Sequence, residues 1–136
     1  MYKTGYILAV VVISLSLFSI AAAPQPPYQP TITLLDPLPT VLAEGETYSV
    51  RILVESEVAF SRVMVMNAPT YPACLASRGV ESAAGGTRAL ITFTLIGRKS
   101  TADRPDGVVP SILSVGVRYG GEGVVVQQFP FAVAIR

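Results

Sequence analysis

Alternation of apolar and polar residues with a period of two is the feature that most restricts the fold of this chain. In Tyr48–Glu55 every even-numbered position is apolar, and three of the four odd-numbered positions are polar. Arg88–Ile96 and Ser111–Tyr119 repeat the pattern. Because successive side chains of a β-strand point to opposite faces, this pattern predicts strands that each bury one face in a core.

Three further segments and a set of turns complete the predicted β-structure. Arg62–Met66 is apolar on both faces, as in a central strand, and Thr31–Leu35 is a weaker first strand. Val124–Ile135 is the last strand, in which Pro130 indicates a bulge or an edge position. A short strand is also expected around Ala73–Ala76. Glycine or proline marks the predicted turns, at Glu44–Glu46, Ala84–Gly86, Arg104–Gly107 and Gly120–Gly123.

These segments predict the fold class of the main part of the chain. About seven short strands are expected, and no sustained 3.6-residue apolar period follows residue 30. The sequence therefore predicts an all-β, immunoglobulin-like two-sheet sandwich over residues 31–136, preceded by an N-terminal hydrophobic helix.

Residues 1–23 predict export from the cytoplasm. Gly5–Ala23 has no charged residue, and Lys3 precedes it. This order is typical of a secretory signal peptide, for which Ala21 or Ala22 is the expected cleavage position. As a helix at ~1.5 Å per residue the segment would reach about 28 Å, which also suits an uncleaved membrane anchor. Under either interpretation the domain is extracytoplasmic, either secreted or anchored to the membrane by residues 5–23.

The linker and the charge balance restrict the partners. Pro24–Pro30 reads PQPPYQP, which favours an extended, semi-rigid spacer. After residue 23 the chain has nine arginines and lysines against nine carboxylates. Nucleic acid and acidic membrane surfaces attract clustered positive charge, which this chain lacks. Nucleic acid is therefore not expected as a partner, and the membrane is expected only through the N-terminal segment. A neutral, apolar β-domain is, however, poorly protected against self-association.

The residue types needed for catalysis are scarce. The chain has no histidine, which excludes a Ser–His or Cys–His pair within one chain and removes the commonest transition-metal ligand. The carboxylate pair considered for a metal ion is Asp103 and Asp106, in a predicted loop. A Pro-Asp-Gly turn explains both residues, and a Ca²⁺ site is the alternative. We therefore expect no enzymatic activity, no cofactor and no metal.

Two predicted loops supply candidate contact residues. Tyrosine-bearing loops at one end of a β-sandwich are common recognition surfaces. The alternative for Tyr71 is a structural one, in which its ring caps the core. Cys74 is the only cysteine and is expected to be a small buried apolar residue, with a disulfide to a second chain as the alternative. The candidate contact residues are Tyr71, Pro72, Cys74, Gly120, Gly121 and Gly123.

Three segments also carry a resemblance to known domains. They are EGETYSVRILVES (residues 44–56), GGTRALITFTL (85–95) and VGVRYGGEG (115–123). In this order of strands and glycine turns, residues 30–136 resemble the CARDB-like and archaeal S-layer-associated immunoglobulin-like domains. The resemblance implies an adhesion, spacer or assembly module on a cell-surface protein. The first hypothesis for function is therefore an exported, non-catalytic module, in adhesion or envelope structure, that acts through protein–protein contacts.

Two other functions remain open at this stage. One is a self-assembling envelope or filament subunit, in which Thr31–Leu35 adds as a strand to a neighbouring domain or the apolar Val124–Val126 pairs edge to edge. The other is a domain that binds a small ligand or Ca²⁺.

Overall fold

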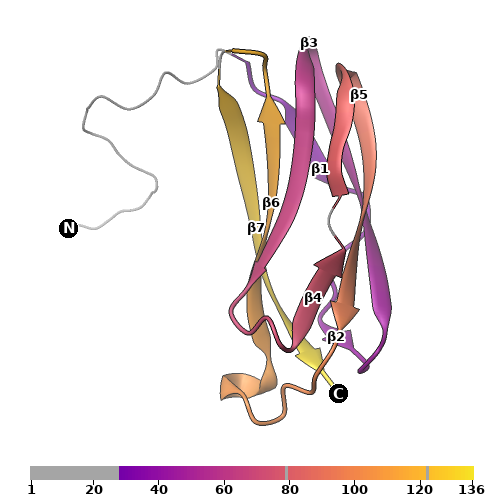
Figure 1. Cartoon of the computed structure of the whole chain (residues 1–136), viewed down its shortest axis with the longest axis vertical. Helices are drawn as coiled ribbons and strands as arrows, with labels where there is room; N and C mark the ends of the chain where they lie inside the picture. Colours follow the sequence, from indigo (N-terminus) through magenta and orange to yellow (C-terminus); the bar gives the residue numbers. More distant parts are fainter. Residues whose placement is uncertain (1–27, 79, 122) are drawn as a thin grey trace, which may run out of the picture.

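The computed structural model describes residues 28–78, 80–121 and 123–136 (Figure 1). The predicted N-terminal helix and most of the linker lie outside these residues, and no helix in the described part is long and apolar enough to span a membrane. The elements are β1 (Thr31–Leu34), β2 (Val41–Leu42), β3 (Thr47–Pro69), β4 (Leu75–Arg78), β5 (Val80–Gly97), a 3₁₀ turn η1 (Pro105–Gly107), β6 (Val109–Arg118) and β7 (Val124–Ile135).

Two long strands, β3 and β5, run through both layers of the domain. The first half of β3 pairs with the second half of β5, from Thr47 opposite Ile96 to Glu55 opposite Arg88. The second half of β3 pairs with the first half of β5 on one side and with β6 on the other. One layer is therefore β1–β3–β5–β4 and the other is β5–β3–β6–β7, and Figure 1 shows both long strands folding over at the same end.

The register between β3 and β5 shifts where the strands fold over. Glu55 lies opposite Arg88 and Phe60 lies opposite Gly86, so β3 has the longer path around the bend. A Cβ atom on Gly85 would lie 2.6 Å from the carbonyl oxygen of Phe60, which requires glycine at this position. The prediction of a turn at Ala84–Gly86 is therefore wrong, because this segment is the interior of a strand that approaches its neighbour closely.

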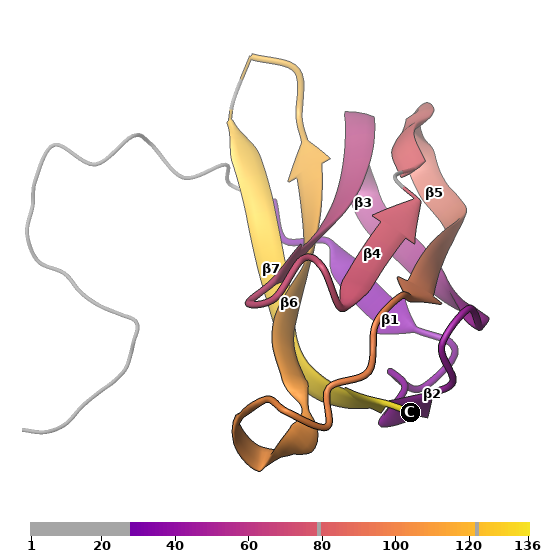
Figure 2. The same cartoon turned by 60° about the horizontal axis from the view of Figure 1, so that its bottom comes forward.

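The all-β prediction is confirmed, and the pairing follows the immunoglobulin order. β1–β3–β5–β4 corresponds to strands A-B-E-D, and the second half of β3 with β6 and β7 corresponds to C-F-G. The layers are nevertheless parts of one continuous sheet and not two separate sheets. β2 joins the end of β7 in parallel pairing, which Figure 2 shows at the end of the domain opposite the fold-over.

The core lies between the two layers and is built from the predicted inward positions. Val50, Ile52 and Val54 are fully buried on β3, as the alternation predicts. The predicted inward residues of the segments 88–96 and 111–119 are also buried, namely Ala89, Ile91, Phe93, Leu95, Leu113, Val115, Val117 and Tyr119. The strand positions were thus predictable from period two, because each strand buries one face only.

The two ends of the domain differ in what they contain. The fold-over end holds the β6–β7 hairpin and Tyr28, whose ring lies 5.0 Å from that of Tyr119. The opposite end, which we call the closed end, holds the β3–β4 loop, the segment from Arg98 to Val108, β2 and the C-terminal Arg136 (Figure 1).

Candidate contact surface

The structure places the two predicted contact loops at opposite ends of the domain. Gly120, Gly121 and Gly123 lie at the tip of the β6–β7 hairpin, at the fold-over end. Tyr71 and Pro72 lie in the β3–β4 loop, at the closed end. The six residues therefore do not form one surface, and their role in contacts stays a prediction for each loop separately.

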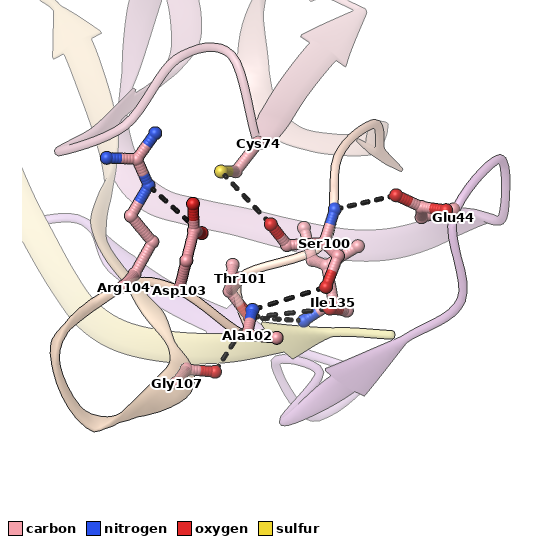
Figure 3. Close-up of polar contacts among 9 residues, drawn as sticks. All are labelled: Glu44, Cys74, Ser100, Thr101, Ala102, Asp103, Arg104, Gly107 and Ile135. Carbon is pink, nitrogen blue, oxygen red and sulfur yellow. Dashed lines mark hydrogen bonds and ion pairs between the residues drawn. The ribbon is translucent and has the colours of Figure 1, made fainter.

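Part of the β3–β4 loop packs against the core. Tyr71 is half-buried against the core, and the Arg104 guanidinium carbon lies 4.6 Å from its ring centroid. Cys74 is fully buried, with its Sγ 3.9 Å from the carbonyl oxygen of Ser100 (Figure 3). A disulfide from Cys74 to a second chain would therefore need this loop to open. Pro72, in the same loop, is exposed.

A polar cluster around Thr101 joins the strands at the closed end (Figure 3). The Thr101 side chain is buried, and its hydroxyl donates to the carbonyl oxygen of Gly107 at 2.7 Å and accepts from the Ile135 N–H at 2.9 Å. The Ser100 N–H donates to a carboxylate oxygen of Glu44 at 2.8 Å. The bond to Thr101 satisfies the buried Ile135 N–H, so the cluster has a structural role.

The two acidic residues considered for Ca²⁺ do not converge on a site. Asp103 Oδ1 lies 3.8 Å from Arg104 Nε, and Asp106 has a φ of 59° within η1. Among the described residues there is no group of three or more His, Cys, Asp and Glu side chains that could hold a metal ion. The Pro-Asp-Gly turn accounts for this geometry.

A hollow of about 600 Å³ lies at the fold-over end, beside the first described residues. Its lining is mixed, and Ser56 within it shares a 2.8 Å hydrogen bond with the Tyr119 hydroxyl. The lining residues are Tyr28, Gln29, Thr31, Glu55, Ser56, Glu57 and Val58. The first described residues form part of this lining, and we assign the hollow no ligand.

The outer face of the second layer carries apolar side chains on three strands, and the exposed Arg62 and Arg118 border them at the fold-over end. The register aligns Met64 with Gly116 and Val126, and Met66 with Ser114 and Gln128. Met66 is 66% exposed, Val126 is 56% exposed and Ile112 is 37% exposed. We call this surface the apolar face, and it consists of Met64, Met66, Ala68, Ile112, Val126 and Pro130.

The outer face of the first layer is mainly polar. Arg51 lies opposite Thr92, and Glu55 lies opposite Arg88. Two Arg51–Asp36 side-chain bonds of 2.9 Å lower the pKa of Asp36 to about 2, helped by the Arg51 backbone N–H. The large apolar exceptions on this face are Leu90, which is 61% exposed, and the half-buried Leu53 opposite it. The two faces are therefore chemically distinct, and the apolar one was not predicted.

The apolar face ends at the outer edge of β7. The Ala134 N–H donates to Thr40 and the Arg136 N–H donates to Leu42, so the even-numbered residues of β7 direct their backbone groups away from β6. Since the β6–β7 register has no shift, the same holds for Val124, Val126, Gln128, Pro130 and Ala132. No described residue pairs with this edge before β2 covers Ala134.

The outer edge of β7 contains a proline and no charged residue. The missing N–H of Pro130 falls on the outer edge and costs no bond to β6, which confirms the predicted edge position. β7 has no charged residue along its whole length. Edge strands are commonly protected by charges, and within the described part of the chain this one is protected only by Pro130 and β2.

No protein-family model matches this chain, and no curated protein matches it. Among solved structures, domains 4 and 5 of the S-layer protein SbsC superpose with a TM-score of 0.51 at 13% identity, over 82% of this chain and 53% of that one. Native α-2-macroglobulin from Escherichia coli, from domain MG7 to its C-terminus, gives a TM-score of 0.51 at 13% identity, over 82% of this chain and 17% of that one.

These likenesses concern the fold alone. The chain spans about half of the SbsC structure and a smaller part of the macroglobulin structure. The resemblance to S-layer-associated domains is thus supported at the level of architecture, and the resemblance to CARDB-like domains stays a prediction.

Proposed function

We propose that this chain is an exported, non-catalytic module of the cell surface or envelope that acts through protein–protein contacts. The observation that carries the proposal is the apolar face, which is exposed on three neighbouring strands beside an uncharged strand edge. Contiguous exposed apolar surface on a small domain marks an interaction site. The export segment at residues 1–23 and the fold shared with an S-layer protein support the extracytoplasmic location.

Burial of the apolar face against a partner would contribute several kcal/mol to binding, at about 1.5–3 kcal/mol per side chain. Fully burying one aliphatic side chain contributes about 1.5–3 kcal/mol, and Met66, Ile112 and Val126 are together within reach of one partner surface. Ser114 and Gln128, which lie between them, can hydrogen-bond without the desolvation cost of a charge. The face therefore suits a neutral protein partner.

A matched pair of substitutions tests the proposal. Met66 and Leu90 are similarly exposed but lie on opposite outer faces, so Met66→Asp and Leu90→Asp make comparable changes on the two faces. We expect Met66→Asp to reduce the size of the complex released from native envelopes by mild detergent and measured by velocity sedimentation, while Leu90→Asp leaves it unchanged. Equal behaviour of the two variants, with both folded, would contradict the proposal.

Self-assembly is the second candidate function, and the structure favours a different strand for it than Thr31–Leu35. Thr31–Leu34 pairs within its own chain, with Thr31 opposite Glu55, so this strand is already occupied. The free edge of β7 is the better site for strand addition, because its backbone groups have no partner among the described residues.

The fate of the N-terminal segment separates a secreted domain from a tethered one. N-terminal sequencing and intact-mass measurement of the native protein, after membrane fractionation, give the answer. A start at Ala22 or Ala23 in the soluble fraction indicates secretion, and an intact Met1 in the membrane fraction indicates a tethered domain.

A further inference from the structure

We infer that the partner of the β7 edge is a second copy of this chain, paired antiparallel about a two-fold axis at Val126. The inference rests on the second candidate function, since it names the occupant of the free β7 edge. Pairing at this edge extends the sheet and leaves the apolar face exposed. It requires that the edge be self-complementary in backbone groups, in side chains and in charge.

The backbone groups of β7 fit such a pairing. Residues of an antiparallel pair that face the shared edge exchange N–H and C=O groups with the residue directly opposite. Val124, Val126 and Gln128 all direct these groups outward. With Val126 opposite Val126 of the second copy, Val124 lies opposite Gln128 of that copy, and all three residues find partners.

Local features of the sequence end the paired segment on both sides. Pro130 has no N–H to donate, so the ladder cannot continue beyond Gln128. On the other side the β6–β7 hairpin begins, where Gly123 has a φ of 103° and leaves the strand. Because pairing stops at Pro130, the second copy does not meet β2, which covers Ala134.

The side chains and charges also favour a second copy. Across the axis the row Met64, Gly116 and Val126 continues into Val126, Gly116 and Met64 of the second copy. Valine, as a β-branched residue, packs well against its neighbours on a pleated sheet. Residues 24–136 have equal numbers of acidic and basic side chains, so two copies do not repel each other through net charge.

Proline substitutions test the pairing, because an outward N–H can be removed without breaking a bond to β6. Residues 24–136 contain the whole described core and are used for this experiment. We expect the wild-type protein to reach dimer mass in sedimentation equilibrium, and Val126→Pro to remain monomeric. Ala132→Pro makes the same change on the same edge outside the paired segment and should still dimerise. Thermal unfolding checks that both variants are folded.

Disulfide trapping tests the register. Opposite residues of such a pair have Cα atoms about 5.5 Å apart, which is within disulfide range. We expect Val126→Cys to form a cross-linked dimer on mild oxidation. Gln128→Cys should not, because the two copies of residue 128 lie about 13 Å apart along the strands. Cys74 is fully buried and does not compete.

The outcomes separate this inference from the proposed function. A wild-type monomer with no Val126→Cys cross-link overturns the second copy as partner. If Met66→Asp still reduces the native complex in that case, the proposed function stands, because Met66 lies on β3 and away from the paired edge. Cross-linking of Gln128→Cys in preference to Val126→Cys would overturn the register.

Discussion

Replacing Thr101 with valine tests how the closed end of the domain is held together. Valine keeps the size and branching of threonine but lacks the hydroxyl that bonds to Gly107 and Ile135. The Thr101 side chain is 1% exposed, so the Ile135 N–H would be left without a partner away from water. An unsatisfied buried group costs about 1–3 kcal/mol, and the lost bond to Gly107 adds about 1 kcal/mol. We expect a total loss of about 3 kcal/mol.

Thermal unfolding followed by circular dichroism measures this loss. For a domain of this size, about 4 °C of Tm per kcal/mol predicts a fall of roughly 12 °C. Thr101→Ser keeps the hydroxyl and should lose only about 1 kcal/mol for the missing methyl group. Thr92→Val, on the exposed outer face, should stay within about 0.5 kcal/mol. If Thr101→Val is as stable as Thr92→Val, the hydroxyl does not hold this end and the reasoning fails.

Three further predictions concern charge, packing and the thiol. Because the pKa of Asp36 is lowered to about 2 from an unfolded value of about 3.9, its contribution to stability is complete above about pH 4 and is lost as the pH falls through 2. Asp36→Asn should therefore lower the urea midpoint at pH 6 but not at pH 1.5, and an equal effect at both would contradict the ion pair. Gly85→Ala should destabilise the domain by about 1–3 kcal/mol in urea unfolding, because its Cβ would meet the Phe60 carbonyl oxygen. Gly121→Ala, with open space around it, serves as the neutral control. The Cys74 thiol should react with a thiol reagent only in denaturant, and fast reaction of the folded protein would show that the loop opens.

The strands were predictable because each one that buries a single face has apolar residues at alternate positions. Val124–Ile135 has the bounds that the pattern predicts, and Pro130 correctly indicates an edge. The fold-over was not predictable in the same way. Gly85 signals special backbone geometry, but the sequence does not distinguish a turn from the close approach of two strands.

The apolar face depends on the register among β3, β6 and β7, and alternation within a single strand does not predict that register. Met66, Ser114 and Gln128 come from three separate strands and become neighbours only when those strands are paired. One signal did exist in the sequence, because Arg62–Met66 is apolar on both faces. We interpreted that pattern as burial in a central strand. The strand is central, but Met66 is exposed on its outer side.

The placement of the chain ends determines how the domain responds to tension. Tyr28 lies beside Tyr119 at the fold-over end, and the C-terminus lies at the closed end (Figure 1), so a pull between them acts along the strands. It would slide β1 against its antiparallel partner β3, and β2 against its parallel partner β7. In such shear the hydrogen bonds of each pair must break together and not one after another. A domain tethered at its N-terminal side and held at its other end would therefore resist mechanical extension.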